Sequence, residues 1–228
     1  KAKLTRWIMN IINEHTGGFS SFFDVFAGTA SVSKAAIPYA DKIIMNDFLS
    51  SNNIIYQAFF AEGIYDVGKL YSIIEYYNSI NPDSVKDNYF SDNFGDKFFD
   101  YRNSKLIGYI REDIERKRYE LTPKEYAILL ASLIYSIDKI ANTVGHFDAY
   151  IKKEIVYHPL SLQLIKPLEP KVVEIHKEDS NMLARRITAD VAYIDPPYNS
   201  RQYSRFYHIY ENLVEWKKPE LFGVAMKP

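Results

Sequence analysis

The sequence predicts an α/β fold with a mostly parallel sheet. Four short apolar runs, rich in β-branched and aromatic residues, have the length and composition of buried strands. They lie near residues 19–26, 42–45, 171–175 and 191–194. Segments with helical spacing of apolar residues follow these runs, and strands that alternate with helices usually join a parallel sheet. The segment 65–165 shows helical patterns instead, which indicates an insertion between two halves of one sheet domain.

The composition is that of a globular protein. The chain has 228 residues, a formal net charge of −1 and 47% hydrophobic residues. It has no cysteine, and its five histidines lack the spacing of metal ligands, so we expect neither disulfides nor a bound metal. No apolar run reaches membrane-spanning length and no signal peptide is recognisable, so we expect a cytoplasmic protein without a membrane partner. The near-zero charge means that any surface for nucleic acid must be local.

A glycine turn follows the first predicted strand. An amphipathic helix comes before that strand, with apolar residues at helical spacing between Leu4 and Ile12. The strand then runs into Ala27-Gly28-Thr29, and a helix is expected from Ser31. A strand, a tight glycine turn and a helix make a geometry that binds nucleotides, because backbone N–H groups and the helix N-terminus approach the ligand. An ordinary turn between a strand and a helix would show the same pattern.

An acidic residue follows the second predicted strand. Asp47 comes directly after this strand and Asn46. It lies roughly 20 residues beyond the glycine turn, the offset at which a carboxylate meets ribose hydroxyls in βαβ nucleotide sites. The chain has no G-x-G-x-x-G motif, which disfavours NAD and FAD. A nucleotide-like ligand of another kind is therefore expected at this edge of the sheet.

The insertion carries two long predicted helices and a polar loop. One helix covers about 104–118 and ends in a basic cluster, and the other covers about 122–141 and opens with a capping box. The loop 142–148 is too long for a plain connection. Residues 85–102 are aromatic and polar without a clear period. A solvated helix face would explain the basic cluster.

The fourth predicted strand ends in Asp195-Pro196-Pro197-Tyr198. The two prolines stop the strand and hold the backbone of the aspartate in an extended conformation. Asp195 can accept one N–H of a planar amino group, and the carbonyl of Pro196 can accept the other. Tyr198 offers a flat face on which a ring can stack. The tetrad therefore suits an aromatic amine attacking an electrophilic methyl group, whereas the plainer interpretation is a strand followed by a Pro-Pro turn.

Taken together, these motifs resemble the DNA adenine methyltransferases of the Dam-like α class. The resemblance rests on Phe26-Ala27-Gly28, Asp47, Asp179 and the Asp195–Tyr198 tetrad, in this order around an insertion. It covers most of the chain, and the tetrad is its most specific part. It implies a Rossmann-like methyltransferase sheet, S-adenosylmethionine as cofactor, and an adenine flipped out of double-stranded DNA as substrate.

The resemblance also implies roles for individual residues. The cofactor would be bound by Lys1, Asp24, Phe26, Ala27, Gly28, Thr29, Asp47 and Asp179. Among these, Asp47 would hold the ribose hydroxyls and Asp179 would accept the amine of the cofactor's adenine. The catalytic residues would be Asp195, Pro196, Pro197 and Tyr198. DNA would be contacted by Arg116, Lys117, Arg118, Asn142, Thr143, His146, Arg201 and Gln202.

The domain organisation implied by the resemblance is discontinuous. Residues 1–64 and 166–228 would form the catalytic domain, and 65–165 the target-recognition region. Two features depart from the family pattern. Ala30 stands where the family usually has a second glycine, and an alanine does not easily adopt a positive φ. The strands that the family carries beyond the tetrad are not in these residues, so we expect an incomplete sheet with a hydrophobic edge, and doubtful activity for this piece alone.

The expected function is site-specific methylation of the 6-amino group of adenine, in a restriction-modification system with a companion restriction endonuclease. No cysteine can act as nucleophile, which excludes methylation of cytosine at carbon 5. An RNA adenine or a glutamine amide is an alternative acceptor, although amide methylases of this kind generally carry asparagine where Asp195 stands. The remaining alternative is an inactive fragment or a specificity module.

Overall fold

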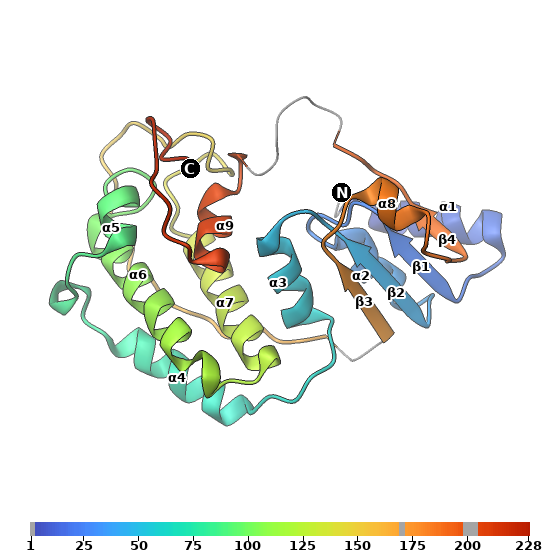
Figure 1. Cartoon of the computed structure of the whole chain (residues 1–228), viewed down its shortest axis with the longest axis horizontal. Helices are drawn as coiled ribbons and strands as arrows, with labels where there is room; N and C mark the ends of the chain where they lie inside the picture. The colour runs from blue at the N-terminus through green and yellow to red at the C-terminus, as the bar shows by residue number, and fades with distance from the viewer. Residues whose placement is uncertain (1–2, 169–171, 198–204) are drawn as a thin grey trace. The chain divides into compact units, whose positions relative to one another are not determined.

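The computed structural model describes residues 3–168, 172–197 and 205–228. The chain divides into two compact units (Figure 1). The sheet unit comprises Lys1–Glu62 and Pro167–Ser200, and the helical unit comprises Gly63–Lys166 and Arg201–Pro228. Each unit has its own packed interior, and each is described separately below.

The sheet unit is built on four parallel strands. These strands are β1 (Ser21–Asp24), β2 (Lys42–Asn46), β3 (Val172–His176) and β4 (Val191–Tyr193). Their order is β3-β2-β1-β4, so β4 lies beside β1 although the two are far apart in sequence (Figure 1). All pairings are parallel. The expected α/β class, with a Rossmann-like parallel sheet, is confirmed.

The central and edge strands differ in burial. Phe22 of β1 and Ile43 and Ile44 of β2 are fully buried, as expected for strands covered on both faces. The two edge strands are only partly covered, and Val172 of β3 is 58% exposed. The apolar residues of β1 and β2 therefore set the centre of the sheet, and β3 and β4 add to it from either side.

Helices cover both faces of the sheet. The helices of this unit are α1 (Thr5–Thr16), α2 (Ser31–Ala36), α3 (Ser50–Phe59) and α8 (Ser180–Ala184). One core packs residues of α1, α2 and α3 against Phe22 and Ile43. A smaller core on Phe23 and Ile44 is closed by Leu183 of α8. The first helix ends at Gly17, which adopts the left-handed conformation with φ 69° and caps it.

The helical unit contains five α-helices in its described part. They are α4 (Val67–Ser79), α5 (Tyr89–Phe94), α6 (Tyr101–Arg116), α7 (Pro123–Asp138) and α9 (His208–Glu215). Two 3₁₀ turns, Pro82–Ser84 and Lys117–Tyr119, join them. The capping box predicted for the second long helix is present in α7, where Thr122 and Glu125 bond reciprocally. The sequence did not predict α4 or α5.

The stretch 85–102, which has no clear period, folds around a cluster of aromatic rings. Phe90, Phe94, Phe98 and Phe99 are all fully buried. Their rings contact one another, with centroids 4.8 Å apart for Phe90 and Phe94. Because the rings converge from one short helix and the turn after it, no helical or strand period is needed to bury them. Asn88 begins α5 through a capping box, which local sequence chemistry explains.

The last helix differs from the expected domain organisation. Residues 166–228 were assigned to the catalytic domain, but the described residues 205–228 pack with the helical unit. The reason is a buried cation: Arg111 of α6 is 1% exposed and donates to the carbonyls of Leu213 and Val214 at the end of α9. The Trp216 indole N–H also donates to Glu112 of α6, at 2.9 Å. The functional meaning of the two units stays a prediction.

Ala30 adopts the conformation that its side chain disfavours. Its φ is 55°, and it stands in the left-handed region as the residue before α2. A left-handed conformation costs an alanine about 1–2 kcal/mol. The packing around the glycine turn therefore imposes this conformation on a buried alanine.

We expect Ala30→Gly to raise the free energy of unfolding by about 1 kcal/mol, because glycine adopts a positive φ without this cost. Urea unfolding measures the change. The matched control is Ala35→Gly within α2, which we expect to lower stability by about 1 kcal/mol. Equal destabilisation by both substitutions would contradict the strain assigned to Ala30.

His208 is enclosed by aromatic rings in the helical unit. It is 5% exposed, and the rings of Phe94, Phe98 and Phe147 have centroids 5.8–6.5 Å from its own. Burial among these rings lowers the pKa of His208 to about 4. The imidazole is therefore neutral in the folded protein at neutral pH.

We expect the free energy of unfolding to fall as the pH drops from about 6.5 to about 4. In this range the imidazole of His208 is protonated in the unfolded chain but stays neutral in the folded protein. Above that range the stabilisation is fully present. The total loss from this group is about 3 kcal/mol. Unfolding of the wild type and of His208→Gln at a series of pH values measures it. A pH dependence unchanged by the substitution would show that other groups cause it.

Candidate functional site

Three of the predicted site segments meet at one edge of the sheet unit. The glycine turn follows β1, Asp47 follows β2, and Asp195 lies two residues beyond β4. Because these strands are parallel and adjacent, their carboxyl ends share one edge. The register places Asp24 between Met45 and Tyr193. Residues separated by more than a hundred positions in sequence are thus brought to the same rim.

Asp47 links the ends of β1 and β2. Its Oδ2 accepts the backbone N–H of Gly28 at 2.9 Å, and its Oδ1 accepts that of Leu49 at 2.8 Å. A carboxylate has about four lone-pair positions, so each oxygen keeps room for a further donor. The side chain is only half-buried. This arrangement suits a pair of ligand hydroxyls.

Phe48, next to Asp47, is a residue that the sequence analysis missed. Its side chain is 72% exposed, which is unusual for a large aromatic residue in a strand-end loop. The exposed ring beside the Asp47 carboxylate has a face on which another flat ring can stack. The sequence contains a signal for this residue, because an aromatic side chain directly follows the acidic residue Asp47.

The glycine turn is held from two sides. Gly28 has φ 54°, and the hydroxyl of Tyr56 in α3 donates to its carbonyl. Burial, reinforced by the nearby charges of Asp47 and Asp24, raises the pKa of Tyr56 well above its usual value. Tyr56 therefore remains a protonated donor. Thr29, at the tip of the turn, is exposed and its Oγ1 lies 2.9 Å from that of Ser31.

Asn46 is a second residue that the sequence analysis did not assign to the site. Its side chain is 1% exposed, and its Nδ2 lies 3.3 Å from the carbonyl oxygen of Val25 and 3.2 Å from that of Glu178. Its Oδ1 accepts the backbone N–H of Glu178 at 3.0 Å. The amide thus joins the loops after β1 and β3 to the end of β2. A buried polar residue at a strand end was the available signal.

Two other predicted cofactor residues have structural contacts. Asp24 is 1% exposed, and the hydroxyl of Ser33 in α2 donates to its Oδ2 at 2.6 Å. Asp179 caps α8, its Oδ1 accepting the backbone N–H groups of Asn181 and Met182. These bonds position both carboxylates. Their cofactor roles stay predictions.

Two further residues predicted to bind the cofactor, Phe26 and Ala27, directly precede Gly28 in the chain. Phe26 is half-buried against the smaller core, and Ala27 is 5% exposed. The N–H of Ala27 donates to the carbonyl of Asn46 at 2.9 Å. Both residues therefore hold the turn against the sheet.

The tetrad begins where β4 ends. The Tyr193 hydroxyl donates to Oδ2 of Asp195 at 3.4 Å, and its ring stacks on Phe22 with centroids 6.4 Å apart. Asp195 is half-buried, whereas Pro196 and Pro197 are exposed. A carboxylate and a proline backbone are thus presented at the rim. Tyr198 lies outside the described residues, as do Lys1, Arg201 and Gln202.

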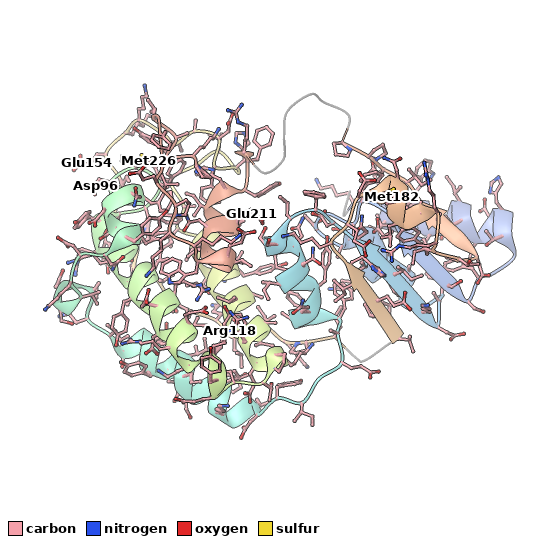
Figure 2. The ribbon with its side chains drawn as sticks, viewed as in Figure 1. Asp96, Arg118, Glu154, Met182, Glu211 and Met226 are labelled. Atoms are coloured by element: carbon pink, nitrogen blue, oxygen red, sulfur yellow. The ribbon has the colours of Figure 1, made fainter. Side chains whose placement is uncertain are left out.

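The predicted basic cluster is paired with acids of its own helix. Arg116 and Lys117 both contact the carboxylate of Asp113, Arg116 at 3.0 Å. Arg118, the middle residue of the 3₁₀ turn and labelled in Figure 2, contacts Glu115 at 3.1 Å. The basic side chains of these i,i+3 and i,i+4 pairs are exposed or partly exposed, so the pairs are weak. A role in DNA binding stays a prediction.

In the polar loop 142–148, the side chains predicted to contact DNA make contacts within the protein. The Asn142 amide donates to the carbonyls of Lys97 at 2.8 Å and Ile151 at 2.9 Å. The Thr143 hydroxyl accepts the N–H of Gly145 at 3.2 Å. The ring of His146 contacts another ring, that of Phe206, with centroids 5.0 Å apart. These three side chains have structural contacts, and DNA contacts for them stay predictions.

Within the described residues, no cluster of three or more histidine, aspartate or glutamate side chains could hold a metal ion. In the same part of the chain, no helix combines the length and the apolar character that crossing a membrane requires.

Known proteins similar to this chain are DNA methylases. It is 30% identical over 248 residues to the modification methylase LlaI of Lactococcus lactis subsp. lactis, covering 98% of this chain and 39% of that protein. It is 30% identical to the type II methyltransferase M.CviAII of Paramecium bursaria Chlorella virus 1 (96% and 68% covered). The type II methyltransferase M.NlaIII of Neisseria lactamica is also 30% identical (94% and 67% covered).

The chain thus spans about two fifths of the LlaI methylase and about two thirds of the other two relatives. No solved structure matches it significantly. Residues 1–228 match the family described as D12 class N6 adenine-specific DNA methyltransferase. The resemblance drawn from the sequence motifs is confirmed at this level, and the chain belongs to the D12 class of N6 adenine-specific DNA methyltransferases.

Proposed function

We propose that this chain transfers a methyl group from S-adenosylmethionine to the 6-amino group of an adenine in double-stranded DNA. The observation that carries the proposal is the convergence of the glycine turn, Asp47 and Asp195 at one edge of a parallel sheet. Membership of the D12 family supports the reaction type. The duplex substrate implies that the adenine is flipped out before it reacts.

The residues around the glycine turn fit the cofactor. Asp47 keeps acceptor positions for ribose hydroxyls, and the exposed ring of Phe48 is a platform for the cofactor's adenine. Gly28 has no Cβ, so the backbone of this turn can approach the ligand closely. When bound, S-adenosylmethionine supplies an electrophilic methyl group on a sulfonium.

The tetrad fits the target amine. Asp195 accepts one N–H of the adenine amino group and the carbonyl of Pro196 accepts the other, while Tyr198 stacks on the base. Two acceptors aimed at the amine protons direct the nitrogen lone pair toward the methyl group. The amine is neutral and needs positioning and an electrostatic seat, not a strong base. We assign Pro197 the task of keeping this backbone rigid.

The relatives suggest the biological setting. They are named modification methylases and type II methyltransferases, so we propose that this chain also serves a restriction-modification system with a companion restriction endonuclease. We place the enzyme in the cytoplasm. The helical unit is our candidate for reading the target sequence.

We expect Asp195→Ala to lower kcat for adenine methylation by at least about 100-fold, because one acceptor of the amine is lost. Affinity for S-adenosylmethionine should stay nearly unchanged. Transfer of labelled methyl groups to duplex DNA measures the first effect, and calorimetry measures the second. The matched control is Asp41→Ala, which removes an exposed carboxylate elsewhere in the sheet unit and should change neither.

Turnover retained by Asp195→Ala would refute its assigned role. Structured RNA serves as a second acceptor in the same assay. Transfer to RNA but not to duplex DNA would overturn the proposed substrate while keeping the reaction type. Absence of S-adenosylmethionine binding by the wild type would overturn the proposal as a whole.

We expect Phe48→Ala to weaken S-adenosylmethionine binding by about 10-fold, because stacking on an aromatic ring contributes about 1–3 kcal/mol per base. Calorimetry measures the affinity. Phe48 is 72% exposed, so the melting temperature should not change. Trp7→Ala, which removes a 62% exposed aromatic residue from α1, is the control and should leave the affinity unchanged. Equal affinity in wild type and Phe48→Ala would rule out the platform.

A further inference from the structure

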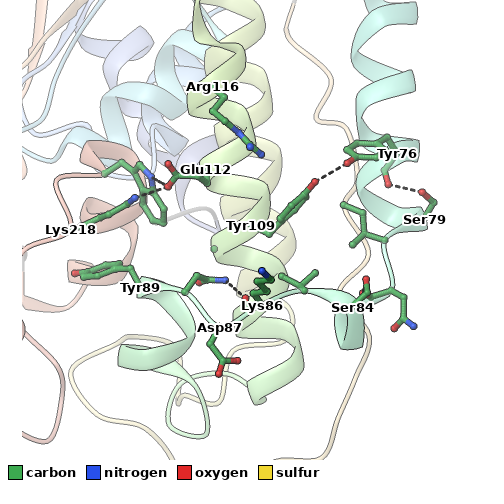
Figure 3. A pocket seen from close by; sticks show the side chains of 16 residues that line it. Tyr76, Ser79, Ser84, Lys86, Asp87, Tyr89, Tyr109, Glu112, Arg116 and Lys218 are labelled. Carbon is green, nitrogen blue, oxygen red and sulfur yellow. Dashed lines mark hydrogen bonds and ion pairs between the residues drawn. The ribbon is translucent and has the colours of Figure 1, made fainter.

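A groove with several charged and hydroxyl side chains lies on the helical unit, apart from the residues assigned to methyl transfer. Its volume is about 760 Å³, and it runs between α4, the segment 81–89 and α6 (Figure 3). Tyr76, Lys86, Tyr109, Arg116 and Lys218 are among the lining residues. Of these, only Arg116 was a predicted DNA contact. The groove is therefore a surface that the sequence motifs did not reveal.

Positive charge is in excess beside this groove. Asp113 is shared by Arg116 and Lys117, as described above. Glu115 is likewise shared by two arginines of this region, Arg111 at 2.9 Å and Arg118 at 3.1 Å. Because Arg111 is 1% exposed, three cations outside the core, Arg116, Lys117 and Arg118, face these two carboxylates, which leaves a surplus of one positive charge.

Lys86 adds a further cation within the groove. It is exposed, and it forms no ion pair with any residue that the structure describes. The two acids of the lining are already engaged. Glu112 accepts hydrogen bonds from Lys218, which lowers its pKa, and from Trp216 (Figure 3). Asp87 bonds to the hydroxyl of Tyr101. The ammonium of Lys86 is thus available to an anionic ligand.

Two tyrosine hydroxyls add neutral donors. The hydroxyls of Tyr76 and Tyr109 lie 2.8 Å apart and form one hydrogen bond (Figure 3). Each hydroxyl has one proton, so the pair uses one and leaves the other for a ligand. Tyr76 is 46% exposed, which makes this proton accessible. Lys86 and the tyrosine pair together present N–H and O–H donors to the same groove.

Cations lie over two of the aromatic rings that line the groove, those of Tyr76 and Trp216. Lys117 lies over the ring of Tyr76, 5.9 Å from its centroid. Arg111 and Lys218 each lie 5.1 Å from the centroid of the Trp216 ring. Stacking of a nucleobase needs an open ring face, whereas a phosphate needs donors and positive charge. The groove offers the second set.

We propose that this groove binds the phosphodiester backbone of duplex DNA, through Lys86, the Tyr76–Tyr109 hydroxyl pair and the surplus charge at the end of α6. This inference rests on the proposed function, because it takes duplex DNA as the substrate. The contact positions the helical unit on the duplex and reads no bases. Its contribution is therefore the same for duplexes of any sequence and decreases with salt.

The test measures the affinity of the full chain for a duplex oligonucleotide by fluorescence anisotropy at a series of salt concentrations. Loss of one phosphate contact in Lys86→Ala should reduce the slope of log K against log salt by about 0.9. Lys86→Glu should weaken binding further. The double variant Tyr76→Phe/Tyr109→Phe keeps both rings and should weaken binding several-fold. The effects should be equal for duplexes of unrelated sequence.

Lys139→Ala is the matched control. Lys139 is an exposed lysine after α7 whose ammonium contacts Gln163 and does not line the groove. A slope unchanged in Lys86→Ala and Lys86→Glu, or an equal reduction in Lys139→Ala, overturns the groove as a DNA site while the proposed function stands. Failure of the wild type to bind duplex DNA overturns both. S-adenosylmethionine affinity, measured in every variant, reports on folding.

Discussion

The hydrogen bond from the Gly28 amide to Asp47 is the constraint on which the site depends. It ties the turn after β1 to the end of β2, at 2.9 Å, and fixes the left-handed backbone on both sides of Thr29. Tyr56 holds the same turn through its carbonyl. A carboxylate that orders a backbone loop and still has free lone pairs can serve structure and ligand together. The sheet edge is therefore prepared before any ligand arrives.

The features that the sequence predicted correctly are those with local causes. Short apolar runs, the offset of Asp47 and the capping box of α7 are all visible within a few residues, and the structure has the corresponding elements. The features that were missed arise from contacts across the chain. The buried rings around Phe94 have no period, and Asn46 joins the end of β2 to two loops that only the folded sheet brings together. The packing of α9 also depends on a distant partner, Arg111.

The same holds for the surface charge of the helical unit: the sequence indicates contacts within one helix but not contacts between distant segments. Spacing alone indicates that Asp113 can pair with Arg116 and Lys117, since they are three and four residues apart on one helix. Spacing does not show that two cations share one carboxylate, or that Lys86 approaches this helix from another segment. A chain with net charge −1 can therefore still present a positive surface, provided that folding gathers the cations.

The burial of Arg111 against the end of α9 has a consequence for protein engineering. The helical unit consists of two stretches of chain, Gly63–Lys166 and Arg201–Pro228. A chimaera that exchanges only the first stretch would remove Arg111 and leave the carbonyls of Leu213 and Val214 without the guanidinium that donates to them. Replacement of this unit therefore requires both stretches to be transplanted as a matched pair.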